Sequence, residues 1–366
     1  MALDSKTPKP DTRSTRPPAG RRDSVTISHE GRDYLLLHAV DPALELGAKN
    51  AVETCLGARH GEQLVLVCEK GLESIGAAIV RAADRAGAEV SAFILDVEDA
   101  ENEPFVSRLS SRLEEAETSI LIASVGGLPA EFRRLMLNVD GRRRHAHMVG
   151  ITEAMMKQSM RADYEEVHAI GERLLRRLEP TSELRVQTSA GTNIVVRGHP
   201  QHRWHNASGL LRSAGWANLP GGEVFTTPLS VDGLVVPDGG MFMPDGSDVA
   251  RGGRLRVRLA RGSVTAIEGP GGEPLLRYLE DVPNGSRVGQ AGFGTNTSLL
   301  TSVGALLQDL KMPGFHLSLG YTCAELTSAE WSSRMEVPLL MRRADVALDG
   351  EPLMVRGRFA RGIGPT

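Results

Sequence analysis

The sequence has no long apolar run and few cysteines. No stretch of about 18 uninterrupted apolar residues occurs, so no segment is expected to span a membrane. The three cysteines, Cys55, Cys68 and Cys323, share no CxxC spacing and cannot form a disulfide framework. The first residues also lack the apolar segment of a secretory signal. We therefore expect a cytoplasmic protein.

An excess of charge of either sign is missing as well. The 42 Lys and Arg residues and the 46 Asp and Glu residues leave a net charge of -4. Binding to nucleic acid or to an anionic membrane needs a concentrated basic face, which this balance does not supply. We expect neither partner. A dinucleotide site is not expected either, because Gly71 and Gly76 after the first predicted strand do not form GxGxxG.

The 366 residues are enough for two domains, each with a core of its own. Residues 1–24 hold four prolines and many basic and hydroxyl residues. Because such a segment offers little apolar area to offset its ordering entropy, residues 1–30 are predicted to be a disordered tail. An α/β domain is expected over residues 31–181 and a β-rich domain over residues 182–366.

The predicted α/β domain alternates helices with short apolar runs. PALELGAKNAVETCLGAR has the apolar spacing of a helix, and GEQLVLVCEKG follows as a turn and a buried strand. The same step recurs in SIGAAIVRAADRAGAEVSAFILD and again in RLSSRLEEAETSILIASVGG. This alternation predicts a parallel sheet with helices on both faces and right-handed crossovers.

The pattern changes after Pro180. ELRVQTSAGTNIVVRG predicts a hairpin, and the remaining chain is rich in glycine and in short β-runs. The predicted fold is thus a parallel-sheet α/β domain followed by a mostly β domain.

Four polar positions in the β-rich half stand in glycine-rich or apolar surroundings. Glu223 follows a glycine pair in NLPGGEVFTTP, and Gln290 lies in GQAGFGTN. His316 lies in the alternating run PGFHLSLGY, and Glu336 precedes the apolar run VPLL. From residue types alone, Glu223 could be a metal ligand, a base or a solvated turn residue. His316 could equally be a hydrogen-bonded core residue, and Glu336 a charge at a strand edge.

The order of the segments resembles the thermophilic aminopeptidase (aminopeptidase T) family of metallopeptidases from about residue 41 to the end. The resemblance includes the α/β half and a series of short segments. These segments are GIT at 150–152, DYEEV, SAGTN, NLPGGEVFTTP, GFGTN, HLSLG and DVALDGEPL. It implies the family's fold, a homodimer, and two metal ions that activate a water for attack on an N-terminal peptide bond.

The same resemblance implies six metal-ligand positions, and this sequence keeps few of the ligands. Glu223 and His316 match the family's Glu and His, and Glu336 replaces a His with another ligand type. Two further positions fall on side chains that cannot coordinate, Leu310 and Pro338. The sixth falls on the neutral amide Gln290.

These losses leave at most a mononuclear site. Glu223, His316 and Glu336 are the expected ligands of one divalent metal, zinc or iron, with Gln290 as a neutral ligand or oxyanion donor. Tyr321 lies close to the position of the family's catalytic Tyr. A chain that binds no metal is the alternative, and Leu310 and Pro338 would then offer an apolar wall to substrate.

The chain also resembles the 2,5-dihydroxypyridine dioxygenases, which share this fold and use one iron. Their two His ligands and one Asp ligand fall on Gln290, Glu336 and Pro338, so none is retained. A third segment of interest is GHPQHRWHNASG, where His202, Arg203 and His205 could border the cleft, with Arg203 as a carboxylate or phosphate clamp.

Three functions therefore stay open from the sequence. The first is a metal-dependent peptidase or amidase with a single metal and a peptide or small-molecule substrate. The second is a non-hydrolytic or catalytically inactive protein that binds peptides or modifies them in a specialised pathway. The third is an iron oxygenase.

Overall fold

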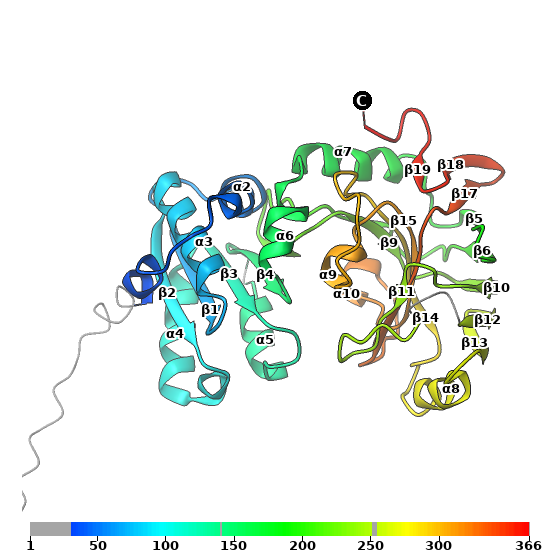
Figure 1. Ribbon diagram of the computed structural model, residues 1–366, viewed down its shortest axis with the longest axis horizontal. Coiled ribbons are helices and arrows are strands. Elements are labelled where there is room, and N and C mark those ends of the chain that lie inside the picture. Colours follow the sequence, from blue (N-terminus) through cyan, green and yellow to red (C-terminus); the bar gives the residue numbers. More distant parts are fainter. Residues whose placement is uncertain (1–30, 140, 251–254, 366) are drawn as a thin grey trace, which may run out of the picture.

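The computed structural model describes residues 31–139, 141–250 and 255–365 of the chain. Figure 1 shows two halves side by side, a layer of helices and strands from the earlier residues and a mostly β half from the later ones. The predicted fold class is confirmed. The predicted disordered tail, residues 1–30, lies outside the described residues.

The first half is a parallel sheet. Its strands pair in the order β2-β1-β3-β4-β8, and all neighbours are parallel. The first four strands are β1 (Gln63–Glu69), β2 (Glu89–Leu95), β3 (Thr118–Ala123) and β4 (Arg144–Val149). The helices between them are α3 (Glu73–Ala86), α4 (Glu103–Glu115) and α5 (Ala130–Leu137). This is the alternation that the sequence predicts.

Alternate residues of the strands face two separate cores. Leu64 and Leu66 of β1 pack in the cluster that contains α3, whereas Val65 and Val67 pack in the cluster that contains α4 and α5. Because successive side chains point to opposite faces, a strand covered on both faces must be apolar along its length. The run LVLV in β1 meets this need.

A continuous helical stretch precedes β1 and packs on α3. It consists of a 3-10 turn (Pro42–Leu44), α2 (Glu45–Lys49) and a π-helical segment (Asn50–Cys55). Asp41 caps its start, since the Asp41 carboxylate accepts a hydrogen bond from the Ala43 N–H at 2.9 Å. The later 3-10 segments span Val97–Glu101 and Ser159–Arg161.

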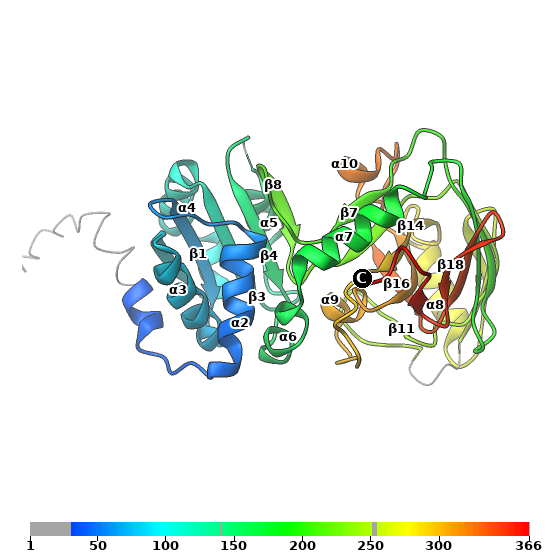
Figure 2. The same ribbon diagram turned by 90° about the horizontal axis from the view of Figure 1, so that it is seen from above.

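Two helices lead from the first half to the second. α6 (Glu153–Lys157) is short, and α7 (Tyr164–Leu175) runs from the α/β layer towards the β-rich half, as Figure 2 shows. Tyr164 belongs to the core of the first half, whereas Leu174 belongs to the core of the second. α7 therefore contributes side chains to both cores.

The second half consists of two antiparallel sheets. The eight-stranded sheet has the order β13-β12-β10-β6-β5-β17-β18-β19, and the six-stranded sheet has the order β11-β16-β15-β14-β9-β7. Strands of the first are β5 (Glu183–Gln187), β6 (Asn193–Arg197), β10 (Ser230–Val235), β12 (Arg256–Ala260), β13 (Ser263–Glu268), β17 (Asp345–Leu348), β18 (Glu351–Val355) and β19 (Arg358–Phe359). Strands of the second are β7 (His205–Ala207), β9 (Glu223–Thr226), β11 (Gly240–Met241), β14 (Val288–Gly294), β15 (Gly314–Gly320) and β16 (Glu336–Met341).

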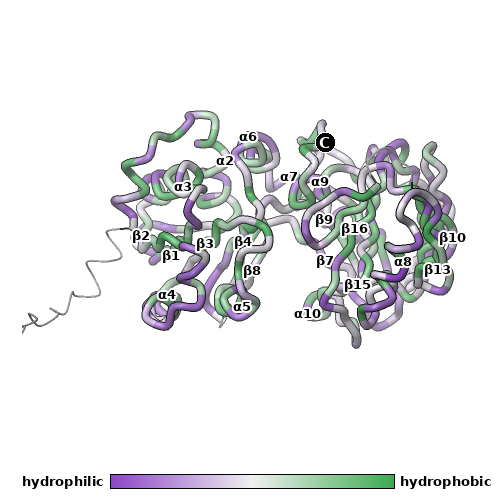
Figure 3. Tube along the Cα trace, turned by 60° about the horizontal axis from the view of Figure 1, so that its bottom comes forward, coloured by the Kyte–Doolittle hydropathy of each residue, from purple (hydrophilic) through white to green (hydrophobic). Residues whose placement is uncertain are grey.

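One face of the six-stranded sheet shares a core with the eight-stranded sheet. Val224, Phe293 and Leu339 of the former pack in one cluster with Val186 and Val196 of the latter. Figure 3 shows hydrophobic segments along the strands and hydrophilic segments on outer helices such as α4. The short helices of this half are α8 (Gly272–Glu280), α9 (Leu306–Asp309) and α10 (Ala324–Thr327).

The chain crosses back once from the second half to the first. After β7 it forms β8 (Gly215–Asn218), which pairs with β4 at the edge of the parallel sheet, and then returns as β9. A boundary at residue 182 would assign β8 to the β-rich half, although β8 pairs in the parallel sheet of the first half. Within the described ranges, no helix is long and apolar enough to cross a bilayer.

Candidate functional site

A cleft of about 890 Å³ lies between the α/β layer and the six-stranded sheet. Val125 and Val149 line it from the first half, and the crossing segment 205–218 lines its side. Glu223 and Lys311 are among the residues that line it from the second half. The cleft is therefore lined by apolar and charged side chains from both halves, Arg133 among those of the first.

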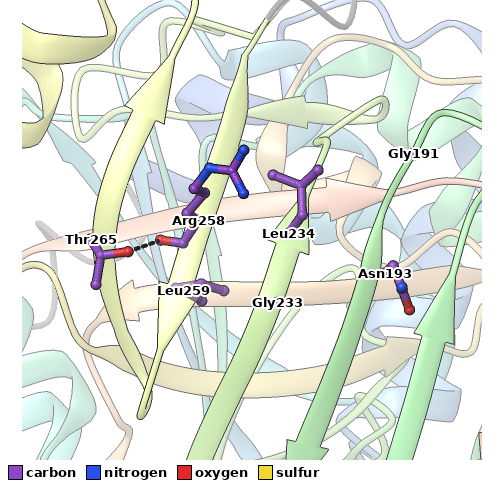
Figure 4. A pocket seen from close by; sticks show the side chains of 7 residues that line it. All are labelled: Gly191, Asn193, Gly233, Leu234, Arg258, Leu259 and Thr265. Carbon is purple, nitrogen blue, oxygen red and sulfur yellow. Dashed lines mark hydrogen bonds between the residues drawn. The ribbon is translucent and has the colours of Figure 1, made fainter.

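A second hollow, of about 550 Å³, lies on the eight-stranded sheet, as Figure 4 shows. Its one ionisable lining residue is Arg258, whose Nε donates to Glu268 Oε1 at 2.6 Å. It brings together no acid, base or nucleophile, so the candidate site is the cleft between the halves.

The register of the six-stranded sheet brings the predicted polar residues to one face. Phe225 pairs with Gly292, which pairs with His316, and Gln290 pairs with Ser318. Ser318 pairs with Pro338, and Gly320 pairs with Glu336. Since side chains alternate along a strand, Glu223, Gln290, His316 and Glu336 all point away from the shared core.

Glycines allow Glu223 to enter this face. A Cβ on Gly221 would lie 2.4 Å from the Ser208 carbonyl oxygen, and one on Gly222 would lie 2.9 Å from Asn296 Cβ. Gly222 also has a φ of 122°, which is strained for any residue with a side chain. The glycine pair thus lets the backbone pass close to two other segments and delivers the Glu223 carboxylate to the cleft.

The Glu223 carboxylate forms an ion pair with Lys311, and both side chains are almost fully buried, at 8% and 3% exposed. Lys311 follows α9, and its segment packs directly on β14. A Cβ on Gly294 would lie 1.9 Å from the Met312 carbonyl oxygen, so glycine is required for this approach. Sequence reasoning missed Lys311 and considered its neighbour Leu310. In the sequence, Lys311 is marked only by its place at the end of the partly apolar segment LLQDLK, a pattern that does not point to a site.

His316 completes the buried group. His316 Nε2 lies 3.7 Å from Glu223 Oε2, and neither atom has a hydrogen-bond partner among the described residues. Burial lowers the pKa of His316 to about 4, although the Glu223 charge opposes the shift. The imidazole is therefore neutral at pH 7. Glycine at position 292 leaves room for the His316 ring, because a Cβ there would lie 2.8 Å from His316 Nε2.

Glu336 lies at the start of β16 and keeps part of its surface exposed to the cleft. Burial raises the pKa of Glu336 to about 7, and the neighbouring Glu223 charge adds to the shift, while Lys311 opposes it. Gln290 also lines the cleft and donates from Nε2 to the Tyr321 carbonyl oxygen at 3.1 Å. The site thus holds a carboxyl group that titrates near neutral pH.

Tyr321 and Cys323 line the cleft beside α10. The Tyr321 hydroxyl donates to Glu325 Oε1 at 3.2 Å, and Cys323 Sγ lies 3.4 Å from the same oxygen. Burial and the Glu325 charge raise the pKa of both groups above their ordinary values. Neither is activated as an anionic nucleophile, because the thiolate and the phenolate are disfavoured here.

The remaining candidates separate into two groups. His205 and Leu310 line the cleft, with the His205 ring 5.7 Å from that of Phe225. His202 and Arg203 do not line it, since His202 Nδ1 is held by the Thr227 carbonyl at 2.7 Å and Arg203 N donates to Thr327. Pro338 is buried within the sheet and does not reach the cleft surface.

These residues do not fit a metal centre. In the described part of the chain, no group of three or more His, Cys, Asp or Glu side chains is placed to hold a metal ion. The Glu223 carboxylate is instead paired with the Lys311 ammonium. A dication needs anionic or neutral ligands, and an ammonium directed at the same carboxylate competes with it.

Comparisons with known proteins place this geometry in context. The model of the thermophilic metalloprotease (M29) family matches residues 143–328. The structure is similar to that of 2,5-dihydroxypyridine dioxygenase from Pseudomonas putida KT2440, with a TM-score of 0.63 and 18% identity over 88% of this chain and 98% of that one. It is also similar to wild-type AmpT from Thermus thermophilus, with a TM-score of 0.61 and 19% identity over 87% and 99% of the two chains. Among curated proteins no sequence matches.

Both solved structures resemble this chain in fold, and one of them is a dioxygenase whereas the matching family model is that of a metalloprotease. At these identities the likeness establishes the architecture alone, so the side chains of the cleft must decide between activities.

Proposed function

The chain belongs to the thermophilic metalloprotease (M29) family, and from this premise we propose that it is a divergent amide hydrolase whose proton-transfer group is Glu336. The observation that carries the proposal is the placement of Glu336 at an open cleft, next to the buried Glu223–Lys311 pair. The substrate class is a peptide or a small molecule with an amide bond.

Two carboxyl groups in unlike environments suit acid–base chemistry. Glu223 is engaged by Lys311, whereas the pKa of Glu336 is raised to about 7, so that both of its protonation states are populated at neutral pH. A general base works best when its pKa lies near the working pH. In this proposal Glu336 is therefore the proton-transfer group, and Glu223 stays ionised in its pair with Lys311.

In the proposed reaction, the Glu336 carboxylate accepts a proton from a water as that water attacks the amide carbon. The carbon–nitrogen bond then breaks, and the protonated Glu336 delivers the proton to the leaving nitrogen. Gln290 has one N–H engaged by the Tyr321 carbonyl and a second N–H available to the negative oxygen. No step uses a metal ion.

The cleft favours a substrate with an apolar portion. Leu211, Phe225, Met243 and Leu310 contribute apolar surface to the same cleft that Glu223, Lys311 and Glu336 line. A mainly apolar cavity with a few convergent polar groups is the usual form of a small-molecule site, and its volume of about 890 Å³ is in the usual range.

The test is a screen of amides and short peptides with chelator-treated protein. We expect hydrolysis that persists in the chelator, is reduced about 100-fold or more in Glu336→Gln, and rises with pH with a midpoint near 7. Loss of activity in the chelator, or full activity in Glu336→Gln, would contradict the proposal. Simple aminoacyl-p-nitroanilides should be poor substrates, because the donor set for two metals is missing.

A second candidate is binding of a peptide without hydrolysis. It is favoured by the Lys311–Glu223 pair, which neutralises the carboxylate nearest His316. Binding of peptides at the cleft, measured by calorimetry, without any turnover in the same screen would support this candidate over the first.

A further inference from the structure

We propose that the Lys311 ammonium is a built-in cation that takes the place and the electrostatic role of a metal ion in this cleft. The inference goes beyond the proposed function, because it concerns which cation the site holds and can be tested without any turnover. It begins from one geometric fact, that a lysine side chain only 3% exposed is directed at a glutamate in a family of metalloproteases.

The side chains around Lys311 are of the types that bind cations. Glu223 forms the ion pair, His316 lies 3.7 Å from the other Glu223 oxygen, and Glu336 lies near enough for both charges to affect its pKa. The two carboxylates would repel each other, or one of them would be protonated, without a positive charge beside them. Lys311 supplies that charge from the chain itself.

The backbone is arranged to hold this lysine. Asn296 N donates to the Lys311 carbonyl oxygen at 2.9 Å, and Lys311 N donates to the Gln308 carbonyl oxygen at 2.9 Å. Gly294 allows the contact of the Lys311 segment with β14, since a Cβ would lie 1.9 Å from the Met312 carbonyl oxygen. The backbone of Lys311 is therefore held against β14, and its buried ammonium is held by the ion pair with Glu223.

The fixed charge and a metal ion exclude each other. A dication that approached Glu223 and His316 would meet the ammonium at short range in a partly water-excluded site, where like charges repel strongly. Lys311 also lines the cleft, so its N–H groups can face the oxygen of a bound substrate. In this way the lysine can stabilise developing negative charge without a metal.

The experiment measures binding of Zn²⁺ alone and of Co²⁺ alone, by calorimetry and by the visible absorption of Co²⁺. Wild-type protein should show no stoichiometric site at the cleft. Lys311→Glu should bind Zn²⁺ about 10- to 100-fold or more tightly than wild type, the scale on which a lost or gained ligand partner changes affinity. Adding Glu223→Gln to that variant should remove the gain.

A second variant covers the case in which Lys311→Glu does not fold. Lys311→Ala should have a lowered melting temperature that rises on addition of methylammonium or Zn²⁺, because either cation can replace the missing charge. The matched control is Lys70→Ala, which breaks the exposed ion pair of Lys70 with Asp96 at 2.7 Å and should show no such rise.

The inference is overturned if wild-type protein binds one equivalent of Zn²⁺ with the affinity of Lys311→Glu. It is also overturned if neither cation raises the melting temperature of Lys311→Ala above that of the untreated variant. Both results concern cation binding, so they are independent of whether the proposed amide hydrolysis is found.

Discussion

The two faces of the six-stranded sheet both bury most of their side chains, but the buried side chains differ in chemistry. Phe293 on one face is 0% exposed, and His316 and Glu223 on the other are 2% and 6% exposed. The first face packs against the eight-stranded sheet with side chains such as Phe315 and Leu339. The second face places carboxylates, an imidazole and an amide beneath α9 and the cleft.

The polar face carries a free-energy penalty of burying charged groups, which the apolar face does not carry. Apolar side chains on the first face gain stability by burial, whereas each buried charge on the second must be paired to avoid a large penalty. Glu223 Oε2 and His316 Nε2 still lack partners among the described residues. These groups lie next to an open cleft, and it is on this face that we place the proposed function.

The largest expected effect comes from the apolar face. Phe315→Ala removes an aromatic ring that is 1% exposed and lies 5.1 Å from the Phe293 ring. We expect the free energy of unfolding to fall by about 3–5 kcal/mol, because both the transfer energy and a cavity are involved. Denaturant unfolding measures the change. A loss near zero would mean that the two sheets do not share a tight core.

On the polar face, Lys311→Met should lower the free energy of unfolding by about 3 kcal/mol, since it leaves the Glu223 carboxylate buried without its partner. The double variant Lys311→Met/Glu223→Gln should recover most of this loss, because no unpaired charge remains. Lys70→Met, at an exposed ion pair, should change stability by less than about 1 kcal/mol. Equal losses in the single and double variants would contradict the pairing.

Gly292→Ala tests the contact between neighbouring strands on the polar face. The new Cβ would lie 2.8 Å from His316 Nε2 and 2.6 Å from the Val224 carbonyl oxygen. We expect a loss of about 1–3 kcal/mol from overpacking. The shift of the His316 ring should appear in its NMR spectrum. A neutral substitution with an unchanged spectrum would show that the imidazole has more room than the distances indicate.

The smallest expected effect is a pH dependence carried by Glu336. Its pKa is raised from 4.5 to about 7, so between these values the folded state retains a proton that the unfolded chain loses. The contribution of Glu336 to the free energy of unfolding therefore falls as pH rises from about 4.5 to about 7, and then levels off.

Glu336→Gln cannot titrate and should lack this fall. Its stability relative to wild type should increase by on the order of 1–2 kcal/mol across that range, a value reduced for the partial exposure of Glu336 to the cleft. Thermal or urea unfolding at several pH values measures the difference, in which the buried histidines common to both proteins cancel. A constant difference would mean that Glu336 titrates as an ordinary exposed carboxyl.

Much of the fold could be predicted from local sequence. The alternation of helices with apolar runs such as LVLV predicts a parallel sheet covered on both faces, and the structure has one. The turn residues of SAGTN predict the hairpin that β5 and β6 form. The return of the chain to the first sheet as β8 was not predicted, because GWAN is too short to carry a periodic signal of its own.

The glycines and the alternating runs were enough to identify most of the candidate polar side chains of the β-rich half, although not Lys311. Glycines before Glu223 and the period of HLSLG set which residues share a face, since alternation along a strand is a local property. What those side chains contact depends on how distant segments pack against each other. Lys311 and Glu223 are 88 residues apart, and no local pattern links them. Their pairing depends on how the segment after α9 packs on β14, a contact that only the folded chain creates.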